Sequence, residues 1–153
     1  MLLLCAFLVG IVAGLRSMTA PAVVSWFARV EILTVAGTPL AWMGYRYTPI
    51  ILTVLAIGEL IADKLPSTPS RKAPPGFITR LVTGALTGAT IGAAGHALVL
   101  CTIVGIVGAV IGTFGGAATR AKLAVTFHRD FPAALLEDAV AILVAIFAIL
   151  RLR

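Results

Sequence analysis

The sequence predicts an all-α fold, a polytopic bundle of about five transmembrane helices that form one integral membrane domain over residues 1–153. Two observations lead to this prediction. Hydrophobic residues make up 60% of the chain and charged residues only 12%, whereas soluble domains have roughly 45–50% and 25%. The apolar residues also occur in long runs, and a helix that crosses a bilayer needs about 20 of them. This composition excludes a soluble enzyme and a disordered chain.

The first expected helix covers residues 1–15. We interpret it as a retained span and not as a cleaved signal peptide, because no basic region precedes the apolar run. Residues 16–21 interrupt it, and Thr19 and Pro21 are typical of the place where a helix restarts. An amphipathic stretch over residues 22–30 follows. The first span is therefore either long and kinked or broken within the membrane.

Residues 31–47 combine Trp and Tyr side chains with a proline. Aromatic clusters of this kind are typical of the membrane interface, and a short additional span is the alternative interpretation. The next expected helix covers residues 49–65. Proline and basic residues dominate residues 66–78, which we therefore expect to form a surface loop.

Residues 79–118 form one apolar tract that is too long for a single span. As a helix it would measure about 60 Å, twice the thickness of a hydrocarbon core. We expect it to fold back at Gly95 and His96 into a tight hairpin. Residues 66–78 and 120–130 then lie on one membrane face, and because both loops are basic this face is predicted to be cytoplasmic. A last span is expected at residues 132–150.

Glycines recur at four-residue spacing along the hairpin and the first helix. Small residues at this spacing let helix backbones approach closely in lipid. They predict a tightly packed bundle, and the alternative is a self-association face that would make the protein a homo-oligomer. A faint similarity between residues 10–29 and 108–129 also suggests a weak inverted repeat, which is common in transporters.

Four of the six acidic residues fall inside expected spans, namely Glu59, Asp63, Glu137 and Asp138. Ionisable groups are costly at such depth, so they face a partner or a water-filled cavity. Glu59 and Asp63 share one helix face because they are four residues apart. Each pair lies near the cytoplasmic end of its helix, so we expect all four carboxylates at the same depth.

Three arginines are expected to reach the same layer, namely Arg16, Arg80 and Arg120. The charged residues have two interpretations. In the first, the two glutamates are the principal ligands of a proton, an ion or a small charged solute, the two aspartates tune them, and the arginines balance charge or bind an anion. In the second, acid–arginine pairs only neutralise one another and hold the helices in register. The first predicts a transporter or channel-like protein, and the second a non-transporting membrane scaffold or assembly factor.

Other kinds of chemistry find no support in the sequence. The net charge is +6, but the basic residues lie mostly in loops and at helix ends, so they indicate contact with membrane lipids and not with nucleic acid. Cys5 and Cys101 lie in apolar runs and form no metal-binding pattern, and no glycine-rich phosphate loop occurs. We therefore expect no cofactor, no metal and no enzymatic activity. The expected location is the inner (cell) membrane, with several crossings.

Many of these residues match a family pattern. They are Gly14, Arg16 and Ser17, then Glu59, Asp63, Lys64, Pro66, Pro69 and Arg71, then Gly84 and Gly88, then Glu137 and Asp138. In these positions the chain resembles a family of small bacterial integral membrane proteins catalogued as domain of unknown function 4126. The resemblance covers nearly the whole chain, and the block that begins at Glu59 is its most specific part. It implies the membrane architecture and points to the same charged residues, but it implies no substrate.

A second resemblance concerns residues 14–19, which are similar to the Ser/Arg/Thr loop of undecaprenyl-diphosphate phosphatases. Glu59 and Asp63 are similar to the paired acids of those enzymes, although the two motifs occur here in the reverse order. A broken helix that offers amides, hydroxyls and an arginine can hold a lipid phosphate. This resemblance implies a lipid-phosphate-binding enzyme or flippase as a third alternative.

Overall fold

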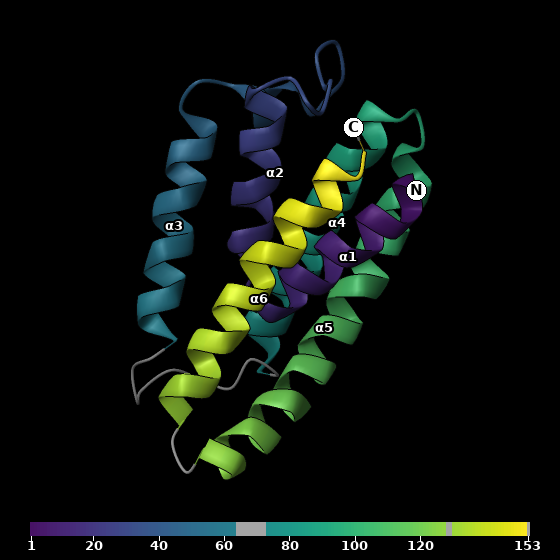
Figure 1. Ribbon diagram of the computed structural model, residues 1–153. Coiled ribbons are helices and arrows are strands. Elements are labelled where there is room, and N and C mark those ends of the chain that lie inside the picture. The colour runs from purple at the N-terminus through teal and green to yellow at the C-terminus, as the bar shows by residue number, and fades with distance from the viewer. Residues whose placement is uncertain (64–72, 128–129, 153) are drawn as a thin grey trace.

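The computed structural model describes residues 1–63, 73–127 and 130–152, with the side chains of residues 124–133 excepted. Six α-helices account for most of this part of the chain, and no strand occurs in it. They are α1 (Leu2–Leu15), α2 (Thr19–Arg29), α3 (Thr48–Ala62), α4 (Pro74–Ala94), α5 (Leu98–Phe127) and α6 (Asp130–Leu150), and a short 3-10 helix, η1 (Ala41–Gly44), lies between α2 and α3. The expected all-α fold is confirmed (Figure 1).

The helix α1 runs parallel to α5 and packs closely against it. Gly10 lies against Gly105, and Gly14 lies one turn further along, against Ala109. In Figure 1, α1 descends obliquely from the end of the molecule at which the chain starts. It ends at Leu15, because Arg16 leaves the helical conformation for an extended one (φ −140°, ψ 109°).

The helix α2 turns back toward the end from which α1 came. The residues just before α2 contact Glu59, near the end of α3, whereas Trp26, near the end of α2, donates a hydrogen bond of 3.0 Å to Thr53, near the start of α3. The two helices are therefore antiparallel, and Figure 1 shows α2 rising again beside α3. The broken-helix expectation is correct, but the two halves form a reversal and not one continuous span. At 1.5 Å per residue α1 is about 21 Å long and α2 about 16 Å long, and each length is less than the thickness of a hydrocarbon core.

The helices α4 and α5 form the expected hairpin. His96 lies in the short turn between them with a φ of 56°, a left-handed conformation that is uncommon for residues other than glycine. Along the hairpin the backbones almost touch. A Cβ atom at Gly88 would collide with the carbonyl oxygen of Cys101, and one at Gly105 with that of Gly84. The glycine spacing therefore produces close packing, as expected, while the self-association face stays a prediction.

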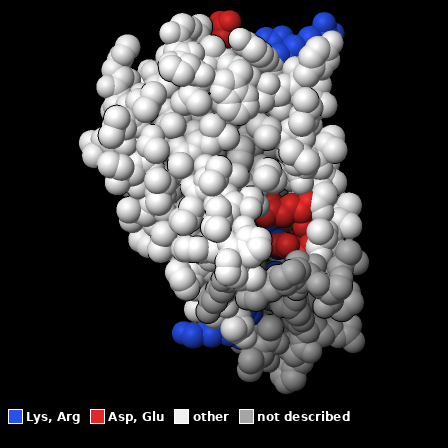
Figure 2. All heavy atoms as spheres, turned by 180° about the vertical axis from the view of Figure 1, so that it is seen from behind, with Lys and Arg blue, Asp and Glu red and all other residues white. Residues whose placement is uncertain are grey.

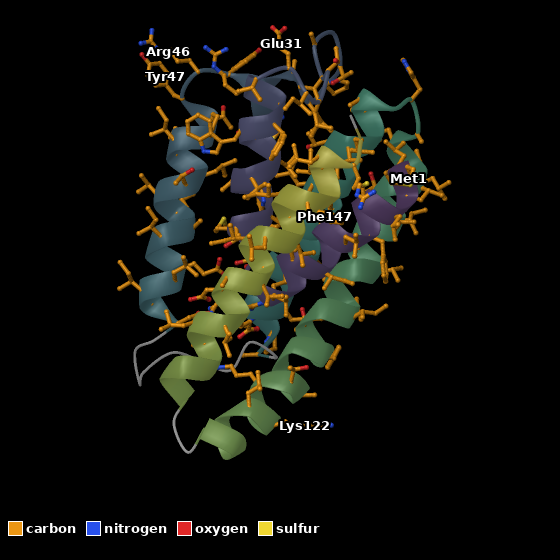
Figure 3. The ribbon with its side chains drawn as sticks, viewed as in Figure 1. Met1, Glu31, Arg46, Tyr47, Lys122 and Phe147 are labelled. Carbon is orange, nitrogen blue, oxygen red and sulfur yellow. The ribbon has the colours of Figure 1, made fainter. Side chains whose placement is uncertain are left out.

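The segment between α2 and α3 contains no long helix. Ser25 on α2 donates a hydrogen bond of 2.7 Å to the carbonyl oxygen of Met43 in η1, and Met43 is fully buried. Trp42 and Tyr47 are exposed, and Tyr47 lies at the upper end of the molecule (Figure 3). The structure has no additional span at residues 31–47, and the aromatic side chains lie at one end of the bundle.

Some expected boundaries change. The helix α3 ends at Ala62, before the expected end at residue 65. The loop expected at residues 120–130 is largely helical, because α5 continues to Phe127 and α6 begins at Asp130. Three of the basic residues that predict a cytoplasmic face, Arg71, Lys72 and Arg129, lie outside the described residues.

The interior of the bundle contains polar side chains beside its hydrophobic core, and the exterior is apolar. Buried threonines donate hydrogen bonds to carbonyl groups one turn earlier in their own helices, and they include Thr83, Thr87, Thr90 and Thr113. Large apolar side chains face outward on α3, α5 and α6, among them Ile50, Val54, Ile61, Val99, Ile103, Leu143 and Phe147. Such a surface is unfavourable in water and favourable in lipid. This distribution favours a membrane protein.

Helix length and composition identify fewer spans than expected. In the described part of the chain, α4 and the Leu98–Leu123 part of α5 are long and apolar enough to cross a membrane, whereas α1 and α3 are apolar but shorter. These criteria support membrane association only weakly, and they do not confirm five spans. The apolar exterior adds to this support.

Gly105 and Gly58 provide a matched test of the glycine packing. Gly105→Ala places a methyl group against the backbone of Gly84, so we expect a loss of about 1–3 kcal/mol in the free energy of unfolding through overpacking. Gly58 has no atom within 4 Å of an added Cβ, so Gly58→Ala should leave stability unchanged or raise it slightly. Thermal unfolding in detergent measures both. Equal stability of the two variants would show that the helices are not closely packed at Gly105.

Candidate functional site

The break between α1 and α2 is the centre of a cluster of charged side chains. Arg16 lies in the break, and its side chain is fully buried. Its Nη1 atom donates to Oδ2 of Asp63, just after α3, and its Nη2 atom lies 2.6 Å from Oδ1 of Asp138 on α6. The same Nη2 atom lies 4.0 Å from Oε2 of Glu137. One buried guanidinium is thus shared by carboxylates from two different parts of the chain.

Glu59, one turn before Asp63, is held by the backbone of the break. Its carboxylate accepts hydrogen bonds from the N–H group of Ser17 (2.8 Å), the hydroxyl of Ser17 (2.5 Å) and the N–H group of Met18 (2.7 Å). These donors lie at the N-terminal end of α2, where unpaired N–H groups and the helix dipole favour an anion. Glu59 therefore stabilises the start of α2. Sequence reasoning missed Ser17 and Met18 as its partners, because main-chain donors do not depend on the residue type.

Arg80 binds the other side of the break, at the C-terminal end of α1. It is buried, and its Nε atom donates to the carbonyl oxygen of Gly14 at the end of α1 (3.1 Å), while its Nη1 atom donates to that of Gly76 (3.1 Å). The hydroxyl of Thr113 on α5 donates to the same Gly14 oxygen (3.3 Å). A cation is favoured at the C-terminal end of a helix. The break therefore has a cation where α1 ends and an anion where α2 begins.

Arg120 extends the cluster to α5, since its Nη1 atom lies 3.8 Å from Oε2 of Glu137. The structure thus brings together residues that the sequence singled out from four helices and from the break. Arg16, Asp63, Asp138, Glu137 and Arg120 form one chain of contacts. Glu59 joins this chain through the break itself, and Arg80 joins through the end of α1.

The cluster is open to the surface on one side. The side chain of Asp63 is 17% exposed, whereas those of Glu137 and Asp138 are 8% and 9% exposed. Figure 2 shows acidic side chains gathered in a hollow of the face opposite to the view of Figure 1, with basic atoms beside them. Asp63 is therefore the most accessible of these three carboxylates.

Two further polar atoms of the break are buried. The hydroxyl of Thr19 and the Nε atom of Arg16 have no hydrogen-bond partner within the described part of the chain. Buried groups of this kind normally bind water or a ligand. The sequence indicated Thr19 as the start of a helix and as part of the segment that resembles a phosphate-binding loop, but its burial depends on how α2 packs.

In the part of the chain that the structure describes, the cluster contains four carboxylates and three guanidinium groups, so carboxylates outnumber arginines. An anion added at the break would compete with the carboxylates that already contact the buried Arg16. Among the described residues, no three His, Cys, Asp or Glu side chains are placed to hold a metal ion. Neighbouring carboxylates that share cations can instead share a proton.

Comparisons of the chain with protein-family models, with curated proteins and with solved structures give no match. The resemblance to domain of unknown function 4126 therefore stays a prediction. The functional argument rests on the geometry of the cluster.

Arg16→Met tests whether the buried guanidinium holds the carboxylates. The substitution leaves Asp63 and Asp138 without the cation they share, so we expect a loss of about 3–5 kcal/mol in the free energy of unfolding. Adding Asp63→Asn and Asp138→Asn removes the uncompensated charges and should restore much of this loss. Denaturant unfolding in detergent measures it. A triple variant no more stable than Arg16→Met would contradict the pairing.

Glu59→Gln tests the contact at the start of α2. An amide group retains one acceptor oxygen and loses the charge and the second acceptor, so we expect a loss of about 1–3 kcal/mol. Glu31→Gln is the matched control, because Glu31 is exposed at the upper end of the molecule (Figure 3). Unfolding of the two variants under the same conditions makes the comparison. If both were as stable as the unmodified protein, the carboxylate of Glu59 would not stabilise α2.

Proposed function

We propose that this protein is a small multi-pass membrane protein of the inner membrane that transfers protons through the carboxylate–arginine cluster. It would act as a transporter or channel-like protein. The observation that carries the proposal is the position of Arg16. Its buried guanidinium lies in a helix break and contacts carboxylates from two different parts of the chain, of which Asp63 is partly exposed.

The membrane arrangement in this proposal replaces five simple spans by four crossings and one re-entrant pair. The helices α3, α4, α5 and α6 alternate in direction (Figure 1). In this proposal all four cross the bilayer, and α3, with about 22 Å of helix, is the shortest of them. The helices α1 and α2 enter and leave on the same side, and their break lies within the bundle. Broken helices at charged sites are typical of membrane transporters. The apolar exterior of the bundle and the two long apolar helices support this arrangement.

A proton suits the cluster better than the other candidate ions. Arg16 and Arg80 are buried and contact carboxylate or carbonyl oxygens, which disfavours an anionic substrate at the break. The described acids are not grouped as metal ligands. A carboxylate that shares a guanidinium with a second carboxylate can take up a proton while the guanidinium stays paired with the second. Arg16 therefore never needs to lose all of its partners during transfer.

The contacts suggest an order of events. Asp63 is the most exposed carboxylate of those that contact Arg16, so it receives the proton from the surface. Its protonation weakens its hold on Arg16 and leaves the guanidinium to Asp138 and Glu137 on α6. A shift of Arg16 moves the adjacent residues Ser17 and Met18, and these hold Glu59. The break thus links a protonation event to the start of α2.

A membrane scaffold or assembly factor is the second candidate. The extent of pairing favours it, since one arginine contacts three carboxylates and the ends of both half-helices are neutralised. The lipid-phosphate-binding enzyme or flippase is the third candidate. The hydroxyl of Ser17 supports it, because this hydroxyl donates a hydrogen bond of 2.5 Å to the carboxylate of Glu59, and a carboxylate can act as a base toward a hydroxyl. The carboxylates that already contact Arg16 make a phosphate less favourable at this place than a proton.

Proton flux in liposomes tests the proposal. The protein is reconstituted in vesicles that contain a pH-sensitive dye, and a potassium diffusion potential drives proton entry. We expect flux above that of protein-free vesicles, and Asp63→Asn should reduce it to the level of the leak because Asn cannot take up the proton. Glu31→Gln, which changes an exposed acid outside the cluster, should leave the flux unchanged.

The result distinguishes the candidates. Flux equal to the leak with the unmodified protein would exclude proton transport and favour the scaffold. Full flux in a folded Asp63→Asn variant would exclude the cluster as the path. Thermal unfolding with added polyprenyl phosphates covers the third candidate, because a ligand at 100 times its dissociation constant stabilises by about 2.7 kcal/mol.

A further inference from the structure

A groove between α1, α5 and α6 lies beside the charged cluster and shares Arg120 and Glu137 with it. It has a volume of about 310 Å³, and most of its lining is apolar, including Ile11, Leu15, Ile111, Leu136 and Val140. Its polar residues are Thr119, Arg120 and Glu137. The groove thus has an apolar body and a charged end.

The groove has the length of a lipid chain. Its lining on α5 extends from Ile111 to Leu123, which corresponds to about 18 Å of helix. One leaflet of a hydrocarbon core is about 15 Å deep. A single acyl chain that lies along α5 therefore fits the groove from the charged end toward the centre of the bilayer.

The groove is open because α5 has glycine where a side chain would fill it. Gly115 lines the groove, and an added Cβ there would have no atom within 4 Å. Gly112, one turn earlier, differs, since its Cβ would collide with the backbone of α1. Gly112 therefore serves helix packing, whereas Gly115 leaves space.

The charged end of the groove suits an anionic headgroup. Arg120 lies there with 18% of its side chain exposed, and Lys122 is exposed two residues further along α5, at the lower end of the molecule (Figure 3). A guanidinium has five N–H donors, so Arg120 can contact Glu137 and a phosphate at the same time. Arginine binds phosphate with paired hydrogen bonds.

We infer that this groove binds one anionic phospholipid, with an acyl chain along α5 and the phosphate at Arg120. The inference goes beyond the proposed function, because it requires the chain to lie in a membrane but does not require proton transfer. The bound lipid would also act on the cluster. Its phosphate would share Arg120 with Glu137, and Glu137 lies near Arg16. A lipid in the groove would therefore change the contacts of Glu137, and through Glu137 the charge near Arg16.

Native mass spectrometry of the purified protein tests the inference. Phosphatidylglycerol or phosphatidylcholine is added in detergent, and the retained lipid is counted on the intact chain. We expect one phosphatidylglycerol to be retained in preference to phosphatidylcholine. Gly115→Leu fills the groove and should reduce this retention about tenfold or more. Gly58→Leu, at an equally open position on α3, should retain the lipid.

A second pair of variants tests the headgroup. Arg120→Gln should abolish the preference for phosphatidylglycerol, whereas Arg151→Gln, an exposed arginine beyond the end of α6, should preserve it. Equal retention of phosphatidylglycerol by the unmodified protein and Gly115→Leu would overturn the inference. So would a dimer mass that Gly115→Leu converts to a monomer, because a second copy of the chain would then cover the groove. Because retention is measured without a proton gradient, it is independent of the flux result.

Discussion

The constraint on which the rest of the structure depends is the need to satisfy the backbone at a helix break inside an apolar bundle. Each end of a helix leaves backbone groups without partners, and lipid offers none. Here Arg80 donates to the carbonyl group of Gly14 near the end of α1, and Glu59 accepts from the N–H groups of Ser17 and Met18 just before α2. Each charge has the sign that the helix end favours. The break is therefore stable only while α3 and α4 hold these two side chains in place.

The break in turn determines the positions of the other helices. Arg16 lies between the two half-helices and is fully buried, so it requires carboxylates at the same depth. Asp63 follows α3 and Asp138 lies on α6, and both contact Arg16. The glycines of α1, α4 and α5 allow the backbones around the break to approach closely enough for these contacts. Close packing and charge pairing thus support one another.

The same contacts that stabilise the break make it suitable for proton transfer. A guanidinium with several carboxylate partners keeps a partner when one of them is neutralised. Asp63 is the most exposed of the three carboxylates near Arg16. Glu137 lies near both Arg16 and Arg120, and Arg120 and Glu137 also line the groove along α5. Under the proposed function, the same pairs would stabilise the break and transfer the proton.

The sequence by itself determined the helical class, the apolar exterior, the turn at His96, the interruption after Leu15 and the charged residues of the cluster. These follow from composition, residue spacing and local conformational preference, which act over a few residues. Only the tertiary structure decided that α2 reverses direction, that Glu59 binds backbone N–H groups, and that Arg80 binds a carbonyl group of α1. The direction of a chain after a break depends on contacts with distant helices. Every residue other than proline has the same main-chain N–H donor, so the sequence does not indicate which N–H group a carboxylate binds. Local sequence therefore identifies the charged residues, whereas packing chooses their partners.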